Sequence, residues 1–299
     1  MLTNLQQQPA DALLALIKLH NDDPRADKID LGVGVYKTGQ GDTPVFASIK
    51  AAERILVETQ GTKAYLGPEG DMGFVEKLMP YVFGKSDPTM GGRIEGMQTP
   101  GGTGSLRLAL AVIKKAQVKR IWMGVPSWPN HAQICADLGL ELKTFNHATP
   151  EGTADIDALR AAIAAADEGD AFLFQSCCHN PTGIDYTDAH WDEIAGLVAG
   201  KQILPLLDLA YQGLGKGWEE DAYGMRRVLA AAGRTGGVDL TPIGGQNGLF
   251  SIIPFTPEQV QAMRADHGIY FAGSGRINVA GLTTGNIAQF IAAVAKVTG

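Results

Sequence analysis

The fold is decided by Ile203-Leu204-Pro205-Leu206-Leu207-Asp208, an apolar run that ends on a carboxylate. Two similar runs, residues 120–125 and 171–174, are also short and apolar and are bounded by Gly, Pro or Asp. Runs of this length and composition are typical of strands buried on both faces of a sheet. The sequence therefore predicts at least three strands of a parallel sheet.

Between these runs, apolar residues recur at helical spacing. The spacing predicts helices over residues 47–60, 106–116, 134–140, 157–166 and 191–198. Alternating strands and helices predict an α/β fold, a mostly parallel sheet with helices on both faces. Because ligands of such sheets bind beyond the carboxyl ends of the strands, the residues that follow each run have the most functional weight.

After Gly224 the pattern changes. A helix over 225–232, short strands over 248–252 and 269–272, and a closing helix over 286–297 predict a smaller α+β domain. We therefore expect three parts: an N-terminal arm with part of the small domain (1–43), a large domain (44–224) and a small C-terminal domain (225–299).

Composition excludes several classes of protein. The 299 residues include 25 Lys and Arg against 32 Asp and Glu, a net charge of −7, and no basic run that could line a nucleic acid. No apolar stretch approaches the roughly 20 residues that span a bilayer. Met1 to Ala10 lacks the basic and apolar regions of a secretory signal, which predicts a cytoplasmic protein. The charge and the short apolar stretches predict that it has no nucleic-acid or membrane partners.

A glycine-rich segment, Thr99-Pro100-Gly101-Gly102-Thr103-Gly104-Ser105, runs from a predicted strand over 94–97 into a helix. Unobstructed backbone amides at a helix start suit a phosphate. The alternative is a simple glycine turn with Thr103 or Ser105 capping the helix. The segment lacks the GxGxxG spacing and the GK[ST] ending, which disfavours dinucleotide and P-loop sites.

Polar residues follow the other runs as well. Asp208, with Tyr211 three residues later, needs a cationic or hydrogen-bonding partner, which a protonated ring nitrogen or a helix cap could supply. Cys178-His179-Asn180-Pro181 follows another run, but consecutive ligands do not fit a zinc site, so no metal is predicted. Trp128 could belong to the core or stack on an aromatic ring.

Arg276 lies in Gly273-Ser274-Gly275-Arg276-Ile277-Asn278, among small and apolar residues. Its guanidinium suits bidentate binding of a carboxylate, and the alternative is a surface arginine near a turn.

Together these segments resemble the fold type I, pyridoxal-phosphate-dependent aminotransferases, in particular the aspartate and aromatic amino-acid branch. Two further segments carry the resemblance: Leu31-Gly32-Val33-Gly34-Val35-Tyr36 is similar to the family's substrate loop, and Lys63-Ala64-Tyr65-Leu66-Gly67 to the segment whose tyrosine reaches the neighbouring subunit's cofactor. The resemblance implies the fold type I large domain over 44–224, bound pyridoxal 5′-phosphate, a homodimer, and an amino acid and a 2-oxo acid as substrates.

The resemblance also implies roles for single residues. Gly101, Gly102, Thr103 and Tyr65 would bind the cofactor phosphate, Trp128 would stack on the ring, and Asp208, supported by His131, would pair with the pyridine nitrogen. Asn180 and Tyr211 would donate hydrogen bonds to the 3′ oxygen. The implied substrate-binding residues are Gly34, Trp128, Asn180 and Arg276. Pro126 and Pro181 fall in tight loops of the family, so we expect a cis peptide before one or both.

The chain departs from the family after Tyr211. There the family has a Ser-x-x-Lys motif, whose lysine forms the Schiff base with the cofactor, and then a phosphate-binding arginine. None of the 14 lysines here has that context, and Lys216 is the nearest in sequence to the cofactor residues. We therefore expect an internally shortened large domain with an incomplete sheet.

This departure leaves two functions open. The first is an aminotransferase that acts on aspartate-like or aromatic amino acids, impaired by the missing lysine and holding its cofactor at best without a covalent bond. In it Asp208 and Tyr211 would be the remaining catalytic support. The alternative is a non-catalytic protein that binds pyridoxal or pyridoxamine phosphate or an amino acid.

Overall fold

The computed structural model describes residues 12–25, 27–29, 31–32, 34–84, 94–232, 250–278, 282 and 285–298. Residues 1–65 and 66–299 form two compact units, and each is described by itself.

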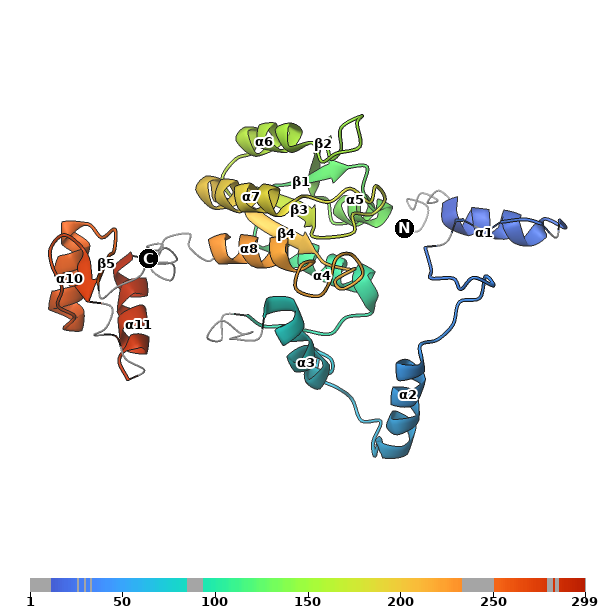
Figure 1. Cartoon of the computed structure of the whole chain (residues 1–299), viewed down its shortest axis with the longest axis horizontal. Coiled ribbons are helices and arrows are strands. Elements are labelled where there is room, and N and C mark those ends of the chain that lie inside the picture. The colour runs from blue at the N-terminus through green and yellow to red at the C-terminus, as the bar shows by residue number, and fades with distance from the viewer. Residues whose placement is uncertain are drawn as a thin grey trace, which may run out of the picture. The chain divides into compact units, whose positions relative to one another are not determined.

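The second unit contains a four-stranded parallel sheet (Figure 1). Its strands are β1 (Arg120–Val125), β2 (Glu141–Asn146), β3 (Ala171–Gln175) and β4 (Leu204–Asp208). The order β2-β1-β3-β4 places β1 and β3 inside the sheet and leaves β4 paired only with β3 among the described strands. The predicted α/β fold with a parallel sheet is confirmed.

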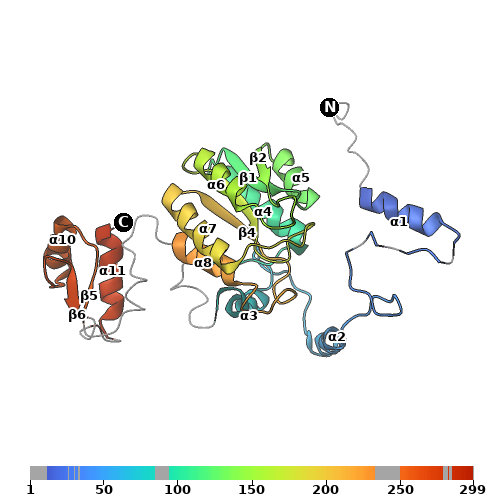
Figure 2. The same cartoon turned by 45° about the horizontal axis from the view of Figure 1, so that its top comes forward.

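Side chains of β3 alternate between two cores. Phe172 and Phe174 pack with α6 (Ile156–Ala165), α7 (Asp188–Lys201) and α8 (Tyr223–Ala232), whereas Ala171 and Leu173 pack with α4 (Gly101–Lys115) and α5 (Pro129–Asp137). Figure 2 shows these two helix groups on opposite faces of the sheet. All five residues of β3 are buried, as expected for a strand covered on both faces.

Helix α8 lies close against α7. A Cβ at Gly224 would lie 2.3 Å from the Trp191 ring, so only glycine allows this approach. The predicted boundary at Gly224 thus falls inside α8, whose Val228 and Ala231 share the α6–α7 core. Arg226 of α8 also donates to the carbonyls of Tyr81 and Val82 at the end of α3 (Met72–Phe83).

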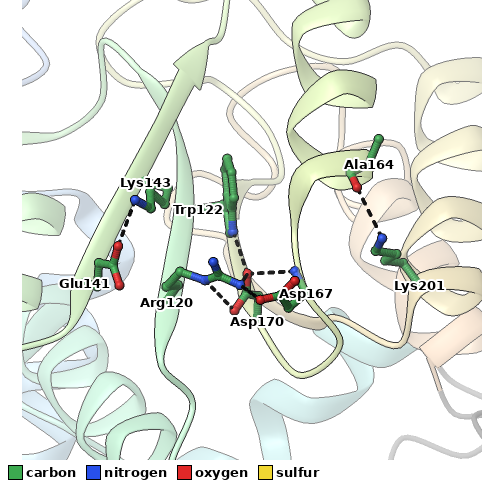
Figure 3. A network of polar contacts seen from close by, with 8 residues as sticks. All are labelled: Arg120, Trp122, Glu141, Lys143, Ala164, Asp167, Asp170 and Lys201. Atoms are coloured by element: carbon green, nitrogen blue, oxygen red, sulfur yellow. Dashed lines mark hydrogen bonds and ion pairs between the residues drawn. The ribbon is translucent and has the colours of Figure 1, made fainter.

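A polar network joins the amino ends of β1 and β3, away from the carboxyl ends where ligands bind (Figure 3). Asp170 accepts hydrogen bonds from Trp122 Nε1 at 2.9 Å and Arg120 Nε at 3.1 Å, and Arg120 also pairs with Asp167. Burial opposes ionisation of Asp170, but these hydrogen bonds prevail and lower its pKa. The network therefore fixes the start of β3 through a buried carboxylate.

The first unit contains α1 (Ala12–Asp22) and α2 (Ala47–Thr59), and no residue of α2 is buried. The C-terminal part contains an antiparallel pair, β5 (Phe250–Ile252) and β6 (Arg276–Asn278), with α10 (Pro257–His267) and α11 (Ile287–Thr298). Ile253, Met263, Ile277 and Phe290 form its core.

Two predicted strands are wrong. Residues 94–97 form no strand, and none of the described strands pairs with this segment. Residues 269–272 also form none, since 276–278 takes the place beside β5. Residues 248–249 of another predicted strand lie outside the described residues. The helix predicted over 134–140 is α5, which begins earlier, at Pro129, and ends at Asp137.

Candidate cofactor site

A cavity of about 500 Å³ opens at the carboxyl ends of the parallel strands. The residues that line it include Gly102, Thr103, Ser105, Trp128, Gln175, Asn180, Asp208 and Tyr211. They end or follow β1, β3 and β4 or begin α4, because parallel strands present their carboxyl ends on one edge. The predicted convergence of Asp208, Asn180, Trp128 and the 101–105 segment on one pocket is confirmed.

The amino end of α4 forms one wall. The helix begins at Gly101, whose φ of +68° favours glycine, and no side chain caps it. Instead, Ser105 Oγ donates to the Gly101 carbonyl at 3.1 Å and lies 2.7 Å from Thr99 Oγ1. Asn130 Nδ2 donates to Thr103 Oγ1 at 3.3 Å. The first-turn amides and the helix dipole make this wall suited to an anion.

Asp208, the last residue of β4, also lines the cavity. Its carboxylate Oδ2 is 2.9 Å from His131 Nε2, and its side chain keeps 27% exposure, whereas His131 is fully buried. The edge of the His131 ring meets the Trp128 ring in a T-shaped contact at 5.3 Å. A carboxylate held on one side and open on the other suits a cationic hydrogen-bond donor.

Asn180 and Tyr211 lie beside this carboxylate, with Asn180 Nδ2 3.5 Å from the Tyr211 hydroxyl. The peptides before Pro126 and Pro181 are both cis, as expected. The loop after Tyr211 is held by Asp221, which accepts backbone hydrogen bonds from Gly213, Gly215 and Lys216. Burial opposes ionisation of Asp221, but these bonds lower its pKa.

The rings of His147 and His179 stack in parallel with centroids 3.5 Å apart. Burial lowers the pKa of both, that of His179 to about 4. His179 Nδ1 lies 2.8 Å from Thr182 Oγ1, and His147 Nε2 donates to the Ile184 carbonyl at 2.7 Å. Both rings are therefore neutral at pH 7 and bring no positive charge to the site.

Sequence reasoning missed Gln175 and Ser127. Gln175 is the last residue of β3, and its amide bonds Ser127 Oγ and the Asn180 backbone. Its place at the carboxyl end of a buried strand was the available signal, because the same reasoning singled out Asp208.

Five predicted site residues are not among those that line the cavity: Gly101, His131, Gly34, Tyr65 and Arg276. Gly34 and Tyr65 lie in the first unit, where Tyr65 is fully exposed, and Arg276 begins β6. Their roles stay predictions. Among the described residues, no lysine lines the cavity, and Lys216 is exposed.

Residues 26–235 match the family model described as aminotransferase class I and II. The chain belongs to this family. Its members depend on pyridoxal phosphate.

Two curated relatives extend the match along the chain. A tyrosine aminotransferase of Rhizobium meliloti is 35% identical, covering 97% of this chain and 98% of its own. An aspartate aminotransferase of Escherichia coli is 33% identical, covering 99% of this chain and 100% of its own. The first alignment spans 383 positions, more than the 299 residues present, so that relative contains positions without a counterpart in this chain.

Solved structures agree on the fold. An aromatic amino acid aminotransferase with 3-indolebutyric acid matches with a TM-score of 0.72 and 30% identity, over 100% of both chains. The enzyme of Burkholderia pseudomallei, covalently bound to pyridoxal phosphate, matches with a TM-score of 0.73 and 24% identity, over 100% of both chains. Among the described helices, none is long and apolar enough to cross a membrane.

Proposed function

We propose that this aminotransferase-family chain binds pyridoxal or pyridoxamine phosphate without a covalent bond. In this proposal, amino transfer between an aspartate-like or aromatic amino acid and a 2-oxo acid is strongly impaired. The observation that carries the proposal is a cavity lined by both Asp208 and the amino end of α4, with no lysine in its lining among the described residues.

The residues present fit the cofactor. Asp208 offers a carboxylate to the protonated ring nitrogen, and the 101–103 amides offer donors to the phosphate. Trp128 offers a flat face to the ring, and Asn180 and Tyr211 offer donors to the 3′ oxygen. The cavity volume, about 500 Å³, lies within the range of small-molecule sites.

Catalysis needs one more group. When bound, the cofactor supplies an electron sink that lets an amino acid lose its α proton, and a positioned base must accept that proton. Among the described residues, the cavity offers no lysine for this step. Loss of a positioned base removes a factor of about 10² to 10⁴ in rate.

Two observations support an internal loss of sequence as the cause. The alignment with the R. meliloti enzyme is longer than the chain, although it reaches almost from end to end of both proteins. In addition, among the described strands β4 pairs only with β3 and none pairs with residues 94–97, as expected when neighbouring strands are missing.

The second candidate is a non-catalytic protein that binds the cofactor or an amino acid. The retained Asp208–His131 pair favours it, because a binding function needs this pair but no lysine. In both candidates Arg276 and Gly34 would bind the substrate. A cytoplasmic homodimer, with Tyr65 reaching the partner's cofactor, fits the exposed Tyr65 and the exposed apolar residues of α2, such as Ile49 and Ile55.

The binding test is calorimetric titration with pyridoxamine phosphate. We expect Asp208→Asn to weaken binding by about 10- to 100-fold, because a hydrogen bond to a charged group contributes about 1.5–3 kcal/mol. Asp266→Asn, an exposed position on α10, is the matched control and should bind like the wild type. Equal affinity of the wild type and Asp208→Asn would show that Asp208 does not bind the cofactor.

Activity separates the two candidates. In an amino-transfer assay with aspartate, phenylalanine and 2-oxoglutarate, the impaired enzyme predicts slow turnover that Asp208→Asn abolishes. A non-catalytic binder predicts no turnover. Turnover as fast as that of the R. meliloti tyrosine aminotransferase would contradict the proposed impairment.

A further inference from the structure

We infer that Asp221 is a positioning residue that holds Tyr211 at the cavity through the glycine-rich turn between them. The turn covers residues 212–217, directly after Tyr211, and three of its backbone N–H groups donate to the Asp221 carboxylate. The effect on cofactor binding rests on the proposed function, whereas the hydrogen bonds of the turn do not.

The turn has a composition that does not order itself. Three of its six residues are glycines, and glycine loses more conformational freedom on folding than any other residue. The Asp221 carboxylate offsets this loss by accepting from three amides at 2.8 to 3.0 Å, those of Gly213, Gly215 and Lys216. Hydrogen bonds to a charged acceptor are stronger than neutral ones, so one side chain orders most of the turn.

The glycines also let the backbone reach the carboxylate. A Cβ on Gly215 would lie 2.7 Å from Asp221 Oδ1, closer than a side chain allows. Gly213 has a φ of +87°, which favours glycine, and a Cβ there would lie 3.0 Å from the Trp218 ring. The residues that make the unfolded turn flexible are therefore the ones that allow it to close around Asp221.

Asp221 is suited to this role because it is both buried and charged. The residue keeps only 5% exposure, and although burial opposes ionisation, its backbone hydrogen bonds lower its pKa. Burial of a carboxylate is costly unless hydrogen bonds satisfy its oxygens. The carboxylate and the turn therefore stabilise each other.

The turn connects this carboxylate to Tyr211, which lines the cavity. The Leu214 N–H donates to the Tyr211 carbonyl at 3.0 Å and so closes the turn on that residue. The amides on either side of Leu214 are both bound to Asp221. Release of these two amides would open the bond between Leu214 and Tyr211, and the Tyr211 side chain would lose its fixed place in the lining.

The first test measures hydrogen exchange of single backbone amides by NMR in the protein without cofactor. In Asp221→Asn, whose side chain has one acceptor oxygen instead of two, the three bound amides should exchange about 10- to 100-fold faster, whereas those of β3 should keep their rates. Glu220→Gln is the matched control, because it removes the same charge from an exposed neighbour, and it should change none of these rates. Unchanged rates in the turn, or an equal acceleration in β3, would overturn the inference.

The second test is a double-mutant cycle on the binding of pyridoxamine phosphate, measured by calorimetry. Tyr211→Phe should weaken binding about 3- to 10-fold in the wild type, because it removes one hydrogen-bond donor. In the Asp221→Asn background the same change should have no effect, because Tyr211 is no longer held at the cavity. A general loss of stability would not couple these two positions. The same factor in both backgrounds would overturn the inference.

Gly215→Ala tests the turn with the carboxylate kept in place. Its Cβ displaces the backbone from Asp221, so we expect the same faster exchange and the same loss of the Tyr211→Phe effect. Circular dichroism confirms that each variant folds, and Gly215→Ala keeps the test decisive where Asp221→Asn does not fold. If Tyr211→Phe has no effect in the wild type while the turn amides respond to Asp221→Asn as expected, the result would instead count against the proposed function.

Discussion

Strands β3 and β4 are neighbours with similar apolar sequences but different surroundings. Every residue of β3 is buried, whereas no residue of β4 is, and Leu204 keeps 41% exposure. β3 pairs on both sides and β4 on one. Apolar composition therefore predicts a strand, but the presence of a second neighbour decides its burial. Stability should concentrate in β3, whereas Asp208 at the end of β4 stays open to a ligand.

Removing a large side chain from each strand gives the largest expected contrast. Phe172 of β3 is fully buried and stacks on Trp122 with ring centroids 5.7 Å apart. We expect Phe172→Ala to lower the free energy of unfolding by about 3–5 kcal/mol, because it leaves a cavity. Leu204→Ala in β4 is the matched control and should cost less than about 1 kcal/mol. Urea unfolding measures both free energies. Equal decreases in the two variants would show that β3 does not contribute more to stability than β4.

The histidine stack beyond β3 predicts a pH dependence. Burial lowers the pKa of His179 from 6.5 to about 4. Between pH 6.5 and pH 4, this histidine therefore binds a proton in the unfolded chain but not in the folded one. Its contribution to stability is complete above pH 6.5, falls as the pH drops toward 4, and amounts to roughly 2–3 kcal/mol. His179→Asn should flatten the curve of unfolding free energy between pH 6.5 and 4. A curve as steep as that of the wild type would show that His179 is not the titrating group.

The amino end of β3 gives a smaller effect. Asp170→Asn removes the charge that Arg120 and Trp122 bind, and we expect a loss of about 1–2 kcal/mol at pH 7. Because the folded pKa of Asp170 lies below its usual 3.8, its contribution is present above that value and disappears as the pH falls through the lower folded pKa. The difference between variant and wild type should therefore vanish in acid. A difference that persists there would assign the loss to packing.

The sequence predicted the parts of the molecule that depend on local pattern. Apolar runs located β1, β3 and β4, and the polar residues after them located Asp208, Trp128 and Asn180. Strand β2 was missed because four of the six residues in its Glu141–Asn146 run are polar.

What depends on distant partners could not be predicted. Residues 94–97 pair with none of the described strands, and residues 276–278 rather than 269–272 pair with β5. Gln175 ends a buried strand, as Asp208 does, but its hydrogen bonds with Ser127 and the Asn180 backbone form only in the folded chain. Strand pairing and hydrogen-bond partners are set by tertiary contacts, which a single sequence does not display.

The most direct test of the central claim is borohydride reduction of the protein saturated with pyridoxal phosphate, followed by peptide mapping. Reduction fixes the cofactor to any lysine that has formed an imine with it. A label counts as site-dependent when it disappears in Asp208→Asn. The account predicts that no lysine peptide carries such a label. It also predicts that dialysis removes the unreduced cofactor. A stoichiometric label on one of the 14 lysines, such as Lys216, that requires Asp208 would show that another residue forms the covalent bond and would contradict the claim.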